Sequence, residues 1–410
     1  MKVWIKLLIG TILGILLGLV LPQNNQNLMG FITWLEQVVL QIGRYSLAPT
    51  LFFSLMIAIY EVRQDKHLWP IIGRTFIVII ISSLIILITG ILVPLLFPPA
   101  RIPILAEGQK ESIPFDVGQA ILDIFPTNMF TALFPRGDYL LPLWVFAFFV
   151  GAGFSYDRNY TKPVIALADS LSRIFYYIST FFSEILGILI ITIAAYWAIQ
   201  FKEALQAGVY RDLILILAIY ATALCFIILP LFLYIFGPKT NPWKQVYGLV
   251  GSAISAFISG DLYFSMPILI RQAKENHGIR RRVNTITLPL FTTFARAGSA
   301  MVAAISLIVI IKSYSSLGIS GSEIVSIFLL SLGLSFLLAR HPGEGAYIGL
   351  AVICSWYGKG FEGGYLILKP IAFYLIGIGT LIDVVVASLG TFVVGKLMNM
   401  QEEREARHFI

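Results

Sequence analysis

Two hydrophobic stretches in the second half of the chain are each interrupted at their centre by a polar segment containing Gly and Pro. The first covers residues 246–270 and reads Ser-Gly-Asp-Leu-Tyr-Phe-Ser-Met-Pro at 259–267. The second covers residues 324–355 and reads Ala-Arg-His-Pro-Gly-Glu-Gly-Ala at 339–346. Each limb beside an interruption has roughly 9–16 apolar residues, whereas a helix needs ~20 to cross a bilayer. The limbs are therefore predicted to enter a membrane and turn back as re-entrant hairpins.

A long apolar segment follows each interrupted stretch, at residues 283–311 and 365–396. The pattern of two short limbs, a polar tip and a long helix thus occurs twice, and we expect the two units to be inverted repeats. Paired, interrupted hydrophobic segments are the sequence pattern that best indicates the midplane binding site of a secondary transporter.

The rest of the composition supports a membrane protein. The chain of 410 residues is 58% hydrophobic and 12% charged, against about 45–50% and 25% in soluble domains. Its apolar runs are continuous, unlike the alternating ten-residue segments of a membrane β-barrel. We expect an all-α polytopic membrane protein with eight transmembrane segments plus the two hairpins. Cys225 and Cys354 lie in apolar surroundings and are expected to be buried as small hydrophobic residues.

Six spans are predicted before the first hairpin. The first begins after Lys6 and is expected to stay uncleaved, because no small-residue cleavage site follows it. Its Gly10, Gly14 and Gly18 form a stripe suited to close helix packing, although the span could also merely tolerate glycine. Proline residues break the fourth span into several short helices. The expected spans run to residue 21, then over 35–60, 75–97, a region ending near 154, 171–199 and 213–236, with a polar connection at 100–118.

The distribution of Lys and Arg predicts the orientation. With the N-terminus in the cytoplasm and each hairpin returning to its own side, the cytoplasmic side holds most basic residues, including the cluster at 271–282. This placement explains the net charge of +7 without a nucleic-acid partner. Both termini are then cytoplasmic, in a plasma membrane or bacterial inner membrane, and the two hairpin tips approach from opposite sides.

Ionisable residues inside a membrane are costly and are treated as functional candidates. For Arg296 there are two interpretations: an ion pair with Asp383 or Asp261 that locks the core, or a group that meets a solute carboxylate or replaces a bound cation. Charges at the second tip are either solvated in a vestibule or bind a ligand, and His341 could also carry a coupled proton. The candidates are Asp261, Arg296, Arg340, His341, Glu344 and Asp383.

Other chemistry is not indicated. The sequence carries no nucleotide-binding glycine loop, no Cys/His metal cluster and no nucleophile elbow. We therefore expect no enzyme activity and no cofactor, with transport driven by a gradient of Na⁺ or H⁺. The remaining histidines, His67, His277 and His408, lie in charged loops or the tail and are expected to be solvated.

Several motifs resemble the glutamate/dicarboxylate:cation symporter family. They are residues 287–300 (TLPLFTTFARAGSA), 342–346 (PGEGA), 389–396 (LGTFVVGK), 270–275 (IRQAKE) and 126–130 (PTNMF). Their order and spacing extend over essentially the whole chain. The resemblance implies a homotrimer in which a transport domain moves against a scaffold as an elevator. It places the scaffold at 1–74 and 119–236 with parts of 75–97 and 171–199, the transport domain at 75–97 and 237–398, and a cytoplasmic tail at 399–410.

The functional residues depart from the family pattern. Its Asn-Met-Asp-Gly-Thr motif is replaced by Ala295, Arg296, Ala297, Gly298 and Ser299. In the last helix, the family's amino-group Asp corresponds to Ile376, its side-chain Arg to Gly379, its Asn to Asp383 and its cation-binding Asp to Ala387, whereas Thr380 is kept. The serine-rich first tip becomes Asp261-Leu-Tyr-Phe.

These departures predict altered chemistry. Loss of the amino-group Asp and the side-chain Arg argues against aspartate or glutamate as the solute. A guanidinium repels a nearby cation by roughly 4 kcal/mol at 4 Å and an effective dielectric constant of 20, so Arg296 could act as a built-in cation. Coupling would then involve protons, one remaining Na⁺ near Asp383, or no ion.

The function expected is secondary active transport of a small organic solute that bears a carboxylate. The alternatives are a proton-coupled or uncoupled carrier of a neutral solute, and a non-transporting receptor or anion channel. Expected solute-binding residues are Arg296, Ser299, Thr380, Asp383, His341, Gly345, Asp261 and Ser265. Expected cation-coupling residues are Asp383, Thr293 and Ser335.

Overall fold

The computed structural model describes residues 2–22, 26–103, 117–133, 139–206, 208–237, 240–314 and 319–410. These residues form helices and turns, and their only strand-like pairings are two isolated bridges. Most of the polar connection expected at 100–118 lies outside the described residues. Eight described helical segments are long and apolar enough to cross a membrane. The seventh in chain order is the first limb of the second hairpin, Gly321–Arg340, and the fourth expected span is too short to be counted among the eight.

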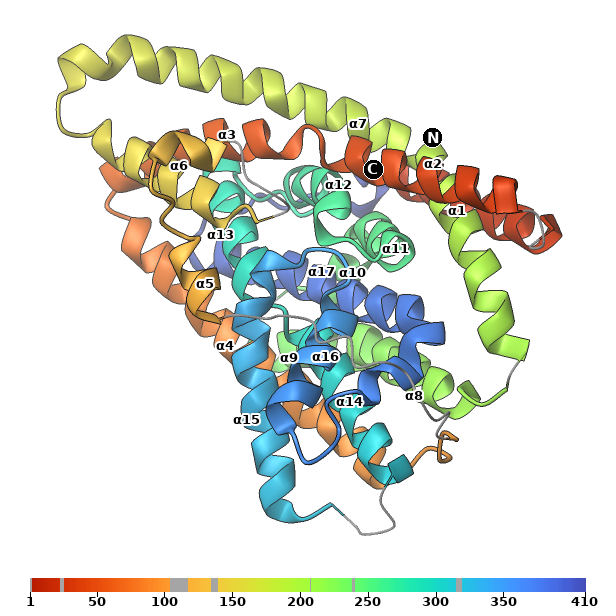
Figure 1. The fold of residues 1–410 in the computed structure, drawn as a ribbon. Coiled ribbons are helices and arrows are strands. Elements are labelled where there is room, and N and C mark those ends of the chain that lie inside the picture. Colours follow the sequence, from red (N-terminus) through yellow and green to blue (C-terminus); the bar gives the residue numbers. More distant parts are fainter. Residues whose placement is uncertain are drawn as a thin grey trace.

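The first half of the chain is built around one long helix, α7 (Arg158–Gln206), which runs along one edge of the molecule (Figure 1). Helix α1 (Val3–Val20) packs along it. A Cβ atom at Gly10, Gly14 or Gly18 would collide with backbone oxygens of α7. The glycine stripe therefore serves close helix packing, as its spacing predicted.

Two expected spans are divided. The span at 35–60 is two helices, α2 (Gln26–Arg44) and α3 (Leu47–Gln64), which continue through a turn at Tyr45 and Ser46. The fourth region consists of short pieces, as its prolines predicted. The remaining elements of this half are α4 (Leu68–Leu96), α5 (Val117–Leu122), η1 (Met129–Leu133), α6 (Leu141–Gly153), α8 (Arg211–Ala223), η2 (Leu224–Ile228) and α9 (Leu229–Phe236).

The second half contains two helical hairpins and the helices that follow them. In the first hairpin, α11 (Val250–Ser259) and α12 (Leu262–Glu275) meet at Gly260, whose φ of 61° lies in the left-handed region that glycine adopts readily. In the second, α15 (Gly321–Leu337) turns through η3 (Leu338–Arg340) into α16 (Gly345–Tyr357). The short helix α10 (Pro242–Gly248) precedes the first hairpin and η4 (Gly364–Ile371) follows the second.

The prediction of a continuous helix over 283–311 is wrong. The segment divides into α13 (Arg281–Phe294) and α14 (Ala297–Tyr314), because Ala295 leaves helical geometry with φ −109° and ψ 54°. The backbone N–H of Arg296 then donates to the carbonyl of Ser335 in α15 at 3.3 Å. The last apolar segment is helical throughout, as η4 followed by α17 (Ala372–Leu397).

Helices α14 and α17 pack together near the centre of the molecule, and α4 packs against both (Figure 1). Nearly all residues of α14 are buried. Cys225 and Cys354 are buried and form no disulfide, as expected.

The expectation that His277 is solvated is wrong. Its residue surface is 1% exposed, and its ring packs edge-on against Phe392. Burial lowers the pKa of His277 to about 4, so the ring is neutral near pH 7. The C-terminal segment covers this region, since the backbone N–H of Ile410 donates to Asn276 at 2.9 Å. His408 is exposed.

Candidate functional site

The break between α13 and α14 carries a fully buried ion pair. The Nε of Arg296 donates to Oδ2 of Asp383 at 2.8 Å, and the two side chains are 0% and 1% exposed. Asp383 lies on α17, 87 residues further along the chain. Of the two partners weighed for Arg296, the structure therefore selects Asp383 and not Asp261. Burial of either charge alone would be costly, so each group requires the other.

Asp383 also caps the first turn of α14. Its Oδ1 accepts the backbone N–H groups of Gly298 at 2.8 Å and Ser299 at 3.2 Å, and its Oδ2 accepts the Ser299 hydroxyl at 2.6 Å. A carboxylate at this position satisfies N–H groups that a helix start leaves unpaired and interacts favourably with the helix dipole. Asp383 thus compensates the charge of Arg296 and stabilises the start of α14 just after the helix break.

The guanidinium of Arg296 lies directly against the second hairpin. Its Nη2 is 3.4 Å from the Ser299 hydroxyl, and a Cβ on Gly345 would collide with it. Its Nη1 is buried and has no hydrogen-bond partner among the described residues. Glycine at 345 therefore lets α16 begin in contact with the ion pair.

Gly345→Ala is expected to destabilise the protein by about 1–3 kcal/mol and to reduce uptake of solute, because the added methyl group must displace either α16 or Arg296. Gly333→Ala is the matched control, since a Cβ there on α15 meets no atom within 4 Å. It is expected to be neutral or to stabilise by up to about 1 kcal/mol. Thermal unfolding in detergent and uptake by proteoliposomes measure the two effects. Equal behaviour of the two variants would contradict the close contact.

The two hairpin tips touch. Asp261 and Gly343 form an isolated antiparallel bridge, and the N–H of Leu262 donates to the Pro342 carbonyl at 3.1 Å. Thr380 ties the first tip to α17, because its hydroxyl donates to the Gly260 carbonyl at 3.1 Å. The two tips are thus in contact with each other, and the first tip is in contact with α17.

Asp261 has two structural roles at the first tip. Its Oδ1 caps α12 by accepting the N–H groups of Tyr263 at 2.8 Å and Phe264 at 3.1 Å. Its Oδ2 pairs with Arg44 at the end of α2, including a 2.6 Å bond from Nε. This ion pair joins the first half of the chain to the first hairpin.

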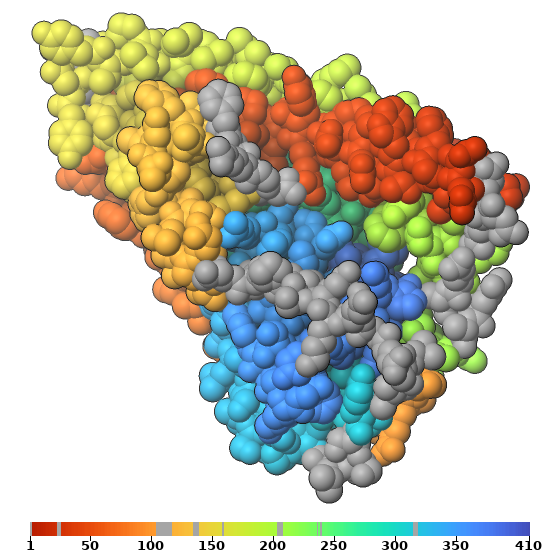
Figure 2. All heavy atoms as spheres, in the orientation of Figure 1, coloured from red at the N-terminus to blue at the C-terminus, as the bar shows by residue number. Residues whose placement is uncertain are grey.

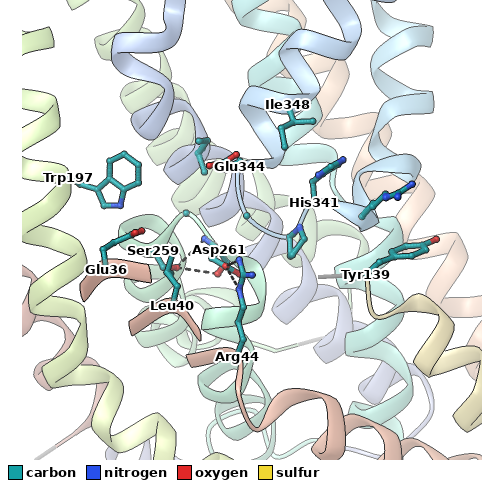
Figure 3. Close-up of a pocket in the computed structure, with 15 residues that line it drawn as sticks. Glu36, Leu40, Arg44, Tyr139, Trp197, Ser259, Asp261, His341, Glu344 and Ile348 are labelled. Atoms are coloured by element: carbon teal, nitrogen blue, oxygen red, sulfur yellow. Dashed lines mark hydrogen bonds and ion pairs between the residues drawn. The ribbon is translucent and has the colours of Figure 1, made fainter. Parts of the chain in front are cut away.

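A cavity of about 480 Å³ lies between the hairpin tips, α2 and α7 (Figure 3). In the space-filling view, the blue segments of the second hairpin lie beside the red helix α2 on one face of the molecule (Figure 2). Trp197 and Glu36 lie at one end of the cavity, and His341 and Tyr139 lie at the other (Figure 3). Ile376 also lines it, so the cavity reaches α17.

Several expected site residues lie elsewhere or have local partners. The hydroxyls of Ser265, Thr293 and Ser335 donate to carbonyls of their own helices at 2.7–2.8 Å, and Ser335 reaches Arg296 only through its backbone carbonyl. At the second tip, Arg340 pairs with Asp123 at 3.0 Å, and Glu344 is exposed. The structure therefore gathers Arg296, Ser299, Asp383 and Gly345 in one cluster and places Asp261 and His341 at the cavity.

The sequence reasoning missed Glu36 and Arg44. Both are charged residues inside a segment predicted to cross the membrane, and that property marked the other candidates. Applied to the span at 35–60, the same criterion would have selected them.

Comparison with known proteins agrees with this architecture. The sodium:dicarboxylate symporter family model matches residues 3–397. The chain is 22% identical to a proton/sodium-glutamate symport protein of Geobacillus stearothermophilus, over 99% of this chain and 96% of that protein. It is 24% identical to the serine/threonine transporter SstT of Enterococcus faecalis, over 97% and 86%. Human excitatory amino acid transporter 3 is 25% identical over 48% of this chain and 37% of that protein. The chain therefore belongs to the sodium:dicarboxylate symporter family, and it is a multi-pass membrane transporter rather than an enzyme.

Proposed function

We propose that the protein is a secondary active transporter that moves a small carboxylate-bearing solute by an elevator mechanism. The moving unit would be 75–97 and 237–398, and the scaffold 1–74 and 119–236 with parts of 75–97 and 171–199 contributing. The packing of α4 against α14 and α17 supports its inclusion in the moving unit. The hairpins would be re-entrant, each unit being one inverted repeat. We further propose a homotrimer with both termini and the tail at 399–410 in the cytoplasm.

The observation that carries the proposal is the buried Arg296–Asp383 ion pair. A carboxylate at the start of a helix in the centre of a bundle offers oxygen ligands to a hard cation such as Na⁺. Here the guanidinium already occupies the position beside Asp383 at 2.8 Å. Arg296 thus acts as a permanent cation, and its charge opposes the binding of Na⁺ next to it.

Arg296 also provides a place for the solute carboxylate. Its Nη1 has no partner among the described residues, and the Nη2 of the same guanidinium lies against Gly345 at the start of α16. A movement of the second hairpin would open this contact and let a carboxylate accept from Nη1, in a charge-assisted hydrogen bond. Ser299 adds a hydroxyl 3.4 Å from the same guanidinium.

The relatives support an amino acid or related acid as the solute. Two of them are named for glutamate and for serine and threonine. The absence of an acidic residue at Ile376 and of a basic residue at Gly379 favours a solute other than glutamate or aspartate.

Uptake into proteoliposomes under imposed ion gradients tests the coupling. Because Arg296 replaces a bound cation, accumulation is expected to depend on the Na⁺ concentration with a Hill coefficient of about 1 or less, or to follow an H⁺ gradient instead. Steep dependence on several Na⁺ ions would contradict the role given to Arg296. Solute binding without accumulation against a gradient would instead indicate a receptor or channel.

A further inference from the structure

The cavity between α2 and the hairpin tips contains one buried carboxylate that lacks a partner. Glu36 is 7% exposed, and among the described residues it has no hydrogen bond or ion pair. In the close-up its carboxylate points into the cavity, between Trp197 and Ser259 (Figure 3). An ionised carboxylate buried without a partner is costly, so a cation of complementary size would stabilise it.

The other charges of the cavity do not supply that cation. Arg44 pairs with Asp261, and Arg340 pairs with Asp123. Glu344 is the other acidic lining residue with no ion pair in the described chain. Glu344, Asp261 and Arg44 all lie close enough to act electrostatically on Glu36, so two carboxylates are set against one guanidinium that already pairs with Asp261. The end of the cavity near Glu36 is therefore negative.

The wall beside Glu36 is suited to an organic cation. Trp197 lines this end of the cavity and is held in place by stacking on Phe373, with ring centroids 3.7 Å apart. Aromatic rings attract organic ammonium groups, whereas Na⁺ prefers several oxygen ligands. The described residues contain no cluster of acidic or His/Cys side chains arranged for a metal ion.

We infer that this cavity binds the ammonium group of a small amine-bearing solute, with Glu36 as the ion-pair partner and Trp197 as the adjacent aromatic wall. The inference rests on the proposed transport function in one respect: it takes the bound amine to be the transported solute. That solute would then be an amino acid rather than a simple dicarboxylate. The cavity of about 480 Å³ has room for such a molecule.

Binding to the purified full-length protein in detergent tests the inference. L-Alanine and L-lactate have the same carbon skeleton and differ in an ammonium against a hydroxyl group, and ethylammonium carries the amine alone. Wild-type protein is expected to bind alanine and ethylammonium more tightly than lactate. Glu36→Gln is expected to weaken binding of alanine and ethylammonium roughly 10- to 100-fold, because one charge-assisted contact is lost. The affinity for lactate is expected to stay unchanged.

Glu403→Gln is the matched control, because the side chain of Glu403 is 83% exposed in the C-terminal tail. It is expected to change no affinity. Equal binding of alanine and lactate to the wild-type protein would overturn the inference without any variant. Equal weakening of all three probes by Glu36→Gln, or loss of Na⁺ binding instead of amine binding, would also overturn it.

The transport assay separates this inference from the proposed function. Selective amine binding without accumulation in proteoliposomes would contradict the transport proposal and support the ammonium site. If a solute accumulated, but its affinity depended neither on an amine group nor on Glu36, the result would support transport and overturn the ammonium site.

Discussion

Replacement of Arg296 by methionine is expected to lower the free energy of unfolding by about 3–5 kcal/mol and to abolish uptake of a carboxylate-bearing solute. The substitution leaves Asp383, whose side chain is 1% exposed, as a buried charge without its ion-pair partner. It also removes the guanidinium whose Nη1 is proposed to meet the solute. Thermal unfolding in detergent and uptake by proteoliposomes measure the two effects.

A second substitution separates stability from binding. Arg296→Met combined with Asp383→Asn removes both charges and retains an oxygen that can cap Gly298 and Ser299. Most of the stability is expected to return, because removal of both partners of a buried pair is much less costly than removal of one. Uptake is expected to remain absent. Restored uptake in the double variant would contradict the anchoring role of Arg296 and favour a neutral solute.

An exposed ion pair provides the control, because it shows the effect of removing an arginine charge that is not buried. Arg173 is 67% exposed and bonds to Asp169 at 3.0 Å on the surface of α7. Arg173→Met is expected to change the free energy of unfolding by less than about 1 kcal/mol. A similar loss at positions 173 and 296 would contradict the importance of burial.

Replacement of Asp261 by alanine has the second largest expected effect, a loss of about 2–4 kcal/mol in stability together with strongly reduced uptake. The substitution removes the cap of α12 and the ion pair with Arg44. The estimate is below that for a fully buried pair because the Arg44 side chain is 25% exposed. Uptake is expected to fall because the lost ion pair joins α2 to the tip of the first hairpin, which contacts the second tip.

Asp261→Asn distinguishes the two roles, since its amide oxygen can still cap α12 but carries no charge. It is expected to cost about half as much as Asp261→Ala. Ser320→Ala is the control for capping alone, because Ser320 caps α15 in an exposed capping box, and it is expected to cost about 1 kcal/mol. If Asp261→Asn lost no stability, the ion pair with Arg44 would contribute nothing, and if it lost as much as Asp261→Ala, the cap of α12 would contribute nothing.

Local features of the fold could be predicted because they depend on local sequence. The glycine stripe of α1 and the short helices around 117–153 follow from residue type and spacing. The two helical hairpins were placed within a few residues, although α12 continues to Glu275. The break at Ala295 was missed, because neither Ala295 nor the residues next to it are proline or glycine, and apolar segments lie on both sides. It is stabilised by Asp383 and by the Ser335 carbonyl, both distant in sequence.

The sequence by itself determined that this is an all-helical membrane protein with two interrupted hydrophobic stretches, and it selected Arg296 and Asp383 as candidates. Only the tertiary structure decided which charges meet. Arg296 pairs with Asp383 across 87 residues, Asp261 pairs with Arg44 across 217, and Glu36 faces a cavity formed by the tips of both hairpins. Hydrophobic runs are local and can be read along a chain, whereas the partner of a buried charge is set by the packing of helices that are far apart in sequence.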